Sequence, residues 1–356
     1  MTKTERIEAV IAGKLPDRPP VLGGWIAHPR ALVEISGAAE ADYLRDPRRV
    51  AVSAYEKLGA DGLIGVFTTK DLDTYRNQNK ENYLKSDTGK SFEEAVRIAE
   101  GLPDAEEYAK QFDFDACYNG LKKEFADMKK ICGDMAYMPA NWSAGARITW
   151  YGEYGYENFF LLVGLRPDLG AKLCRLGGVS GLFYSKLTAR AVTDGLMPKA
   201  VLLGEDICTQ RGPMISMSFM REHYAPELAR GLIPLLEAGC KPVWHCDGDI
   251  RPMLPMLLDC GIKGFQGFQP ECGMHIEEIV NLRARGGEKL LIMGPISVTT
   301  ELPVMTPAEI RAKVKYYADV CKDKADLIFF TANTINPDVP VENIKAFYGA
   351  VNDYAY

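Results

Sequence analysis

Eight short apolar runs recur along this chain, and longer stretches with helical spacing separate them. Each run is continuous rather than alternating, which is typical of parallel strands that are buried on both faces. The runs cover residues 20–24, 61–67, 136–140, 199–204, 241–246, 262–268, 289–294 and 325–331. Repeated strand–helix units over 356 residues predict an α/β fold, a single (β/α)8 TIM barrel that spans residues 1–356. A doubly wound sheet is the alternative, but the sequence has no G-x-G-x-x-G or Walker-type loop.

Helical patterns fill the spaces between the runs. They cover residues 46–58, 105–130, 155–193, 216–238, 250–260, 275–285 and 306–322. Thr306 and Glu309 form the two ends of a capping box, which marks the start of the last of these helices. Pro167 and Asp168 suit the first turn of a helix, so we predict that the stretch 155–193 contains two helices.

Two segments do not fit the repeating units. Residues 1–14 are charged and have an amphipathic pattern, which predicts an N-terminal helical extension rather than a signal peptide. Residues 70–130 are longer and more polar than one barrel unit requires. We expect this second segment to be an insertion that covers one end of the barrel as a lid.

The composition excludes several classes of protein. The chain has 42 Lys and Arg against 48 Asp and Glu, so it lacks the basic surface of a nucleic-acid binder or a polybasic membrane anchor. No apolar run reaches the length of about 18 residues that a membrane span needs. The nine cysteines are scattered without a C-x-x-C pair, which favours a reducing compartment. We therefore expect a cytoplasmic protein with no nucleic-acid or membrane partner.

Polar side chains gather where four of the apolar runs end. In a TIM barrel these carboxyl ends form the functional site. A histidine among several carboxylates suits a divalent metal, above all zinc, because carboxylates that converge without a cation repel one another. The polar residues at the four ends are Glu205, Asp206, His245, Cys246, Asp247, Asp249, Gln269, Glu271, Cys272, Thr331, Asn333 and Thr334.

Strand alternation selects among these candidates. His245 and Asp247 point to the same face of their strand, so we expect them to form a ligand pair, whereas Cys246 points to the helices. Of Glu205 and Asp206, one should face into the barrel, and we favour Glu205. The alternative for His245 is a hydrogen-bonded structural histidine.

An aromatic cluster follows the third run. It either packs as ordinary core or forms a wall for an apolar or aromatic substrate. Its members are Trp142, Trp150, Tyr151, Tyr154 and Tyr156.

Several segments of the chain resemble the uroporphyrinogen decarboxylase-like superfamily, in particular its corrinoid-dependent methyltransferase branch. They occur in the order of the family and span nearly the whole chain. They are Thr4–Arg6 with Pro16–Val21, Glu205–Ser216, His245–Asp249, Gln269–Met274 and Pro340–Ile344. The resemblance implies a (β/α)8 barrel. The decarboxylases proper carry an Arg-Gln-Ala-Gly-Arg-type loop near the N-terminus, whereas residues 23–28 here read Gly-Gly-Trp-Ile-Ala-His.

The resemblance also implies a metal site and a reaction. Thiol-methylating members of the branch bind zinc through a His-x-Cys pair and a later Cys, and these positions fall on His245, Asp247 and near Asn333. Oxygen donors in place of the thiolates leave zinc a stronger Lewis acid, which favours removal of a methyl group from oxygen. The expected activity is therefore O-demethylation: a methyl group passes from a small O-methyl donor, with a methoxylated aromatic compound as the candidate, to the Co(I) cobalamin of a partner corrinoid protein.

Individual roles follow from this mapping. We expect His245, Asp247 and Glu205 to hold the metal. Asp206 or Gln210 would orient a ligand or the substrate, and Asn333 would bind the substrate or complete the coordination. The residues expected to bind the substrate are Trp150, Tyr151 and Gln269.

Three alternatives stay open at this point. The first is methyl transfer from a methylcobamide to a thiol. The second is a metal-independent lyase of the uroporphyrinogen decarboxylase type, which needs cationic residues at the barrel mouth; Arg211 and Arg251 are the obvious candidates. The third is a barrel without activity that binds a corrinoid protein. A homodimer is compatible with each of them.

Overall fold

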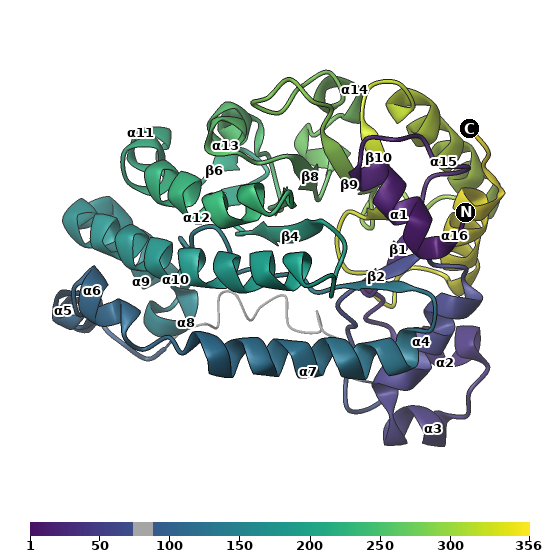
Figure 1. Ribbon diagram of the computed structural model, residues 1–356, viewed down its shortest axis with the longest axis horizontal. Helices are drawn as coiled ribbons and strands as arrows, with labels where there is room; N and C mark the ends of the chain where they lie inside the picture. The colour runs from purple at the N-terminus through teal and green to yellow at the C-terminus, as the bar shows by residue number, and fades with distance from the viewer. Residues whose placement is uncertain (74–87) are drawn as a thin grey trace.

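Eight parallel strands form the centre of the molecule (Figure 1). The structure is a computed structural model and describes residues 1–73 and 88–356. The barrel strands are β1 (Leu22–Gly23), β2 (Gly62–Ile64), β3 (Ala136–Met138), β4 (Ala200–Gly204), β7 (Lys241–His245), β8 (Gly264–Gln266), β9 (Leu291–Ile296) and β10 (Asp326–Thr331). Each of the eight apolar runs overlaps one of these strands, so the predicted strands are confirmed.

The strands pair in two parallel ladders, β1-β2-β3 and β10-β9-β8-β7-β4. A single bridge between Val21 and Phe329 joins the β1 and β10 sides. At the other junction the N–H of Asn141, just beyond β3, donates to the carbonyl of Leu202 in β4 at 2.8 Å. This strand order is that of a (β/α)8 barrel, and the predicted α/β TIM barrel is confirmed.

Helices surround the strands and fill the loops between them. They are α1 (Lys3–Ile11), α2 (Pro29–Ser36), α3 (Glu40–Arg45), α4 (Pro47–Lys57), α5 (Phe92–Gly101), α6 (Ala105–Ala109), α7 (Phe114–Cys132), α8 (Tyr151–Tyr154), α9 (Tyr156–Leu165), α10 (Pro167–Thr193), α11 (Met217–Phe219), α12 (Ala225–Glu237), α13 (Leu254–Cys260), α14 (Ile276–Ile279), α15 (Pro307–Cys321) and α16 (Val341–Asp353). A π-helical turn, η2 (Met220–Tyr224), continues α11 into α12, and two 3-10 turns are η3 (Arg251–Met253) and η4 (Pro270–Cys272). A small hairpin is formed by β5 (Cys208–Thr209) and β6 (Gly212–Pro213).

The predicted helix boundaries agree with the structure in some places and differ in others. The stretch 155–193 contains two helices that meet at Pro167, as predicted. The stretch 105–130 was predicted as one helix but divides into α6 and α7, because Asp113 caps a new helix with its side chain. Only four residues of the stretch 275–285 are α-helical.

The N-terminal helix closes the end of the barrel at which the strands begin, opposite to their carboxyl ends. The apolar face of α1 carries Ile7, Val10 and Ile11, which pack with inward-facing strand residues in one interior cluster. The predicted helical extension is therefore confirmed. Among the described residues, no helix combines the length and the apolar character that a membrane crossing requires.

The predicted insertion at residues 70–130 is only partly described, because residues 74–87 lie outside the described part of the chain. Within the rest, α5 and α6 pack against α9 and α10. The longer α7 contacts β3 and holds the place of the barrel helix that precedes that strand. Of the described residues 88–130, those of α5 and α6 are therefore additional to the repeating barrel units.

Candidate functional site

Asp206, His245 and Asp247 converge at the carboxyl ends of β4 and β7. One possible ligand atom from each lies within 4.8 Å of the other two. The Nε2 atom of His245 is 3.5 Å from Asp206 Oδ1 and 3.9 Å from Asp247 Oδ1. The ligand atoms around a tetrahedral zinc ion lie roughly 3.3 to 3.6 Å apart, given its usual bond lengths. The geometry is therefore close to that of a zinc site.

Alternation along β7 places this histidine inside the barrel. Val243 belongs to the interior cluster and His245 is two residues further on the same face. Trp244 and Cys246 are fully buried in the other core cluster, between the barrel and its helices. The thiol of Cys246 thus packs away from the site, as the alternation predicts.

Gln266, the last residue of β8, fixes the orientation of His245. Its amide nitrogen donates to the carbonyls of Thr331 and Ala332, at 2.7 and 3.0 Å. Its amide oxygen is therefore turned to Nδ1 of His245. Because an amide oxygen can only accept, Nδ1 donates this hydrogen bond, and Nε2 is the ring nitrogen that faces the two carboxylates.

Asp247 is held so that one of its oxygens stays available. The Oδ2 atom accepts a hydrogen bond from the side chain of Asn333 at 2.6 Å. The Oδ1 atom is buried and has no hydrogen-bond partner among the described residues. Burial raises the pKa of this carboxyl group. A buried carboxylate oxygen without a donor is costly unless a cation neutralises it, so the donor set fits a divalent metal.

Glu205, which the sequence favoured as the inward ligand, lies outside the cluster of Asp206, His245 and Asp247. Its carboxylate accepts hydrogen bonds from the hydroxyl of Thr149 and the N–H of Ile148. The backbone explains the difference. Gly204 has a φ of 137°, and a Cβ there would lie 2.0 Å from the carbonyl oxygen of His245. The chain leaves the strand at this glycine, so simple alternation does not extend to residues 205 and 206.

Desolvation makes Glu205 a basic carboxylate, with its pKa raised to about 8 from 4.5. Between these two pH values the unfolded chain releases the proton while the folded chain retains it. The free energy of unfolding therefore falls as pH rises, by up to roughly 1.4 kcal/mol per unit from this group. In metal-free protein we expect Glu205→Gln to gain stability relative to the wild type as pH rises from about 5 to about 8. Urea unfolding at several pH values measures this difference; a pH-independent difference would contradict the assignment.

Tyr151 and Gln269 contact the loops that carry the cluster. The hydroxyl of Tyr151 donates to the backbone carbonyl of Asp206 at 2.9 Å. The amide oxygen of Gln269 accepts from the N–H of Gly248 at 2.6 Å, which joins the loops after β7 and β8. Both side chains are thus placed next to the cluster, where they brace backbone segments.

Trp150 and Gln210 are not brought into the cluster. Trp150 is buried under the guanidinium of Arg147, which lies 4.5 Å from its ring. Gln210 is exposed at the turn of the β5–β6 hairpin. No contact of either side chain with Asp206, His245 or Asp247 is found in the described part of the structure.

Two tryptophans wall the imidazole of His245. The ring centroids of Trp142 and Trp25 lie 5.4 and 5.8 Å from that of His245. Trp25 also stacks on Phe67 and donates its indole N–H to Ile64. Of the predicted aromatic cluster, Trp142 lies against the imidazole of His245, and Tyr151 contacts the backbone of Asp206.

Sequence reasoning missed Trp25 and Gln266. Gln266 could have been found because it is the one uncharged polar side chain within the run 262–268, whose other polar side chain is that of Lys263. Trp25 directly follows the first run, at a strand end that carries no ionisable residue.

Comparisons with known proteins agree with this architecture. Residues 207–354 match the family model "Uroporphyrinogen decarboxylase (URO-D)". A search of curated proteins gave no match. Among solved structures, a methyltransferase from Methanosarcina mazei superposes with a TM-score of 0.63 and 14% sequence identity, covering 99% of each chain. The family match confirms the resemblance to the uroporphyrinogen decarboxylases over residues 207–354, and the solved structure shares its fold with the whole chain.

Proposed function

We propose that this chain is a cytoplasmic corrinoid-dependent methyltransferase; the match of residues 207–354 to the uroporphyrinogen decarboxylase family and the fold shared with a methyltransferase support this proposal. It would take a methyl group from a small O-methyl donor, with a methoxylated aromatic compound as the candidate. The acceptor would be the Co(I) corrinoid of a separate partner protein. The observation that carries the proposal is the free Oδ1 atom of Asp247, which lies 3.9 Å from Nε2 of His245.

His245, Asp247 and Asp206 would hold zinc, with a fourth position open. Asp206 replaces Glu205 in this set because its carboxylate, and not that of Glu205, meets the imidazole. Bound zinc would act as a Lewis acid toward the oxygen that loses its methyl group.

The protein's own groups prepare this site. Gln266 keeps Nε2 of His245 directed inward, and Asn333 fixes the carboxylate of Asp247. Trp25 and Trp142 present aromatic faces beside the imidazole, where they would exclude water and pack against an aromatic donor. The Trp142 side of this wall is 37% exposed, which leaves room for a partner protein to approach.

The decarboxylase alternative is less consistent with the contacts of the arginines. Carboxylate binding needs free cations at the barrel mouth, but the guanidinium of Arg251 is engaged by both oxygens of Asp249 at 2.8 Å. Arg211 is exposed at the hairpin turn and forms no ion pair within the described residues. The pairing of Arg251 leaves the lyase with one of its two candidate arginines, which favours the methyltransferase.

A direct test mixes the zinc-loaded protein with a reduced corrinoid protein and a panel of methoxylated donors. We expect the Co(I) absorbance to disappear with one donor and the demethylated product to form in equal amount. Protein treated with a chelator serves as the control and should leave Co(I) unchanged. Bound zinc without loss of Co(I) for any methyl donor would contradict the proposed reaction.

A further inference from the structure

Glu271 is an exposed carboxylate at the mouth of the barrel that forms no ion pair within the described residues; the guanidinium of Arg251, which packs against nearby Gly273, is paired with Asp249. Glu271 lies in η4, which three residues separate from the end of β8. The hydroxyls of Ser297 and Thr300 donate to it at 3.4 and 3.3 Å. Of the lysines and arginines in residues 1–73 and 88–356, none approaches this carboxylate within 4.0 Å. Two hydroxyl donors therefore orient the group without neutralising its charge.

The loop that carries Glu271 is fixed relative to the proposed metal site. Gln269, two residues earlier, accepts the N–H of Gly248 in the loop that carries Asp247. This hydrogen bond joins the loop of Glu271 to the loop of Asp247, so the two carboxylates belong to the same mouth of the barrel.

The charge of Glu271 is not balanced by the charged groups around it. A zinc ion with the carboxylates of Asp206 and Asp247 is neutral in sum. Arg251 is paired with Asp249 and Arg147 with Glu153, whereas Arg211, at the turn of the β5–β6 hairpin, forms no ion pair within the described residues. On the β8 side of the mouth, Glu271 therefore carries a negative charge without an ion-pair partner, which disfavours an anionic donor there and favours a cationic one.

The aromatic wall supports the same conclusion. Trp142 presents a partly exposed ring beside His245. Such a ring packs against an aromatic donor and also attracts a cation over its face. The mouth of the barrel thus carries the carboxylate of Glu271 and the indole face of Trp142. Together they suit a molecule with an ammonium group, which pairs with the carboxylate, and an aromatic ring, which packs on the indole.

We propose that the methyl donor is a methoxylated aromatic amine and that Glu271 is the residue that selects its positive charge. This inference rests on the proposed function, since it concerns the donor of that same site. Glu271 would pair with the ammonium group while the methoxy oxygen faces His245 and the two aspartates.

A matched set of ligands tests the charge preference. The compounds 3-methoxybenzoate, 3-methoxybenzyl alcohol and 3-methoxybenzylamine share one ring and carry a negative, a neutral and a positive group near pH 7. We expect the zinc-loaded protein to bind the amine about fivefold more tightly than the alcohol, and the benzoate most weakly, by calorimetric titration. In Glu271→Gln the amine should bind no better than the alcohol, while the affinity for the alcohol stays the same.

The control is Glu222→Gln, which neutralises a glutamate that is 74% exposed and bonded only to a neighbouring histidine. It should leave the order of the three ligands unchanged. Equal binding of amine and alcohol by the wild type, or an equal effect of Glu271→Gln on all three ligands, would overturn the selection. A charge preference in binding without demethylation of any compound would instead count against the proposed function and leave the role of Glu271 supported.

Discussion

Replacing His245 with alanine is expected to abolish stoichiometric zinc binding and to lower methyl transfer to the corrinoid by at least about 100-fold. His245 supplies the nitrogen ligand, and its removal leaves Asp206 and Asp247 as two facing carboxylates without a partner. Two carboxylates alone form a weak zinc site, because their repulsion raises the pKa of one of them. Metal analysis of the purified variant and the Co(I) absorbance assay measure the two effects.

Two further variants make this result specific. His275→Ala removes an exposed histidine outside the cluster and should bind zinc as the wild type does. Gln266→Leu keeps all three ligands but removes the group that orients the imidazole, so zinc should bind roughly 10- to 100-fold more weakly. Full zinc occupancy in His245→Ala would exclude the proposed site.

The barrel could be predicted from the sequence because its strands are buried on both faces. Such strands must be continuous apolar runs, and each run therefore marks a strand directly. Several helices were missed, including α2, α5 and α16. Their apolar residues are spaced among charged residues in short segments, and loop residues have similar composition.

The candidate site could be predicted only in part. His245 and Asp247 were found because strand alternation holds along β7 up to its end. The preference for Glu205 over Asp206 relied on the same alternation beyond Gly204, where a backbone conformation available mainly to glycine ends the strand. Trp25 follows β1 and is distant from His245 in the sequence. The two rings meet only because the barrel closes.

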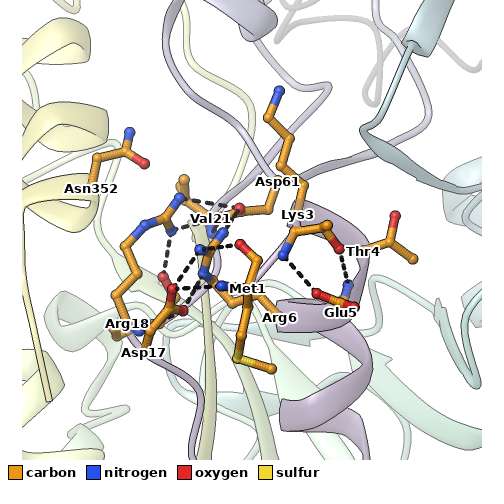
Figure 2. A network of polar contacts seen from close by, with 12 residues as sticks. Met1, Lys3, Thr4, Glu5, Arg6, Asp17, Arg18, Val21, Asp61 and Asn352 are labelled. Carbon is orange, nitrogen blue, oxygen red and sulfur yellow. Dashed lines mark hydrogen bonds and ion pairs between the residues drawn. The ribbon is translucent and has the colours of Figure 1, made fainter.

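Replacing Asp61 with alanine is expected to lower the free energy of unfolding by about 3 to 5 kcal/mol. Asp61 precedes β2, and its side chain is fully buried. It accepts hydrogen bonds from Arg6 at 2.6 Å, from Arg18 at 2.8 Å and from the N–H of Val21 at 2.9 Å (Figure 2). Removal of the carboxylate leaves two largely buried guanidinium groups short of a counter-charge and one buried N–H without an acceptor.

The location of this network determines what the substitution should leave intact. Arg6 lies on α1 at the end of the barrel where the strands begin, and Asp17 also binds its guanidinium (Figure 2). Asp134→Ala is the matched control, because Asp134 forms an exposed ion pair with Lys3 and its loss should cost less than about 1 kcal/mol. Urea unfolding distinguishes the two variants, and equal losses would show that the buried pairing adds nothing. At temperatures where both variants stay folded, zinc binding should be unchanged, since the network holds the end of the barrel opposite to His245.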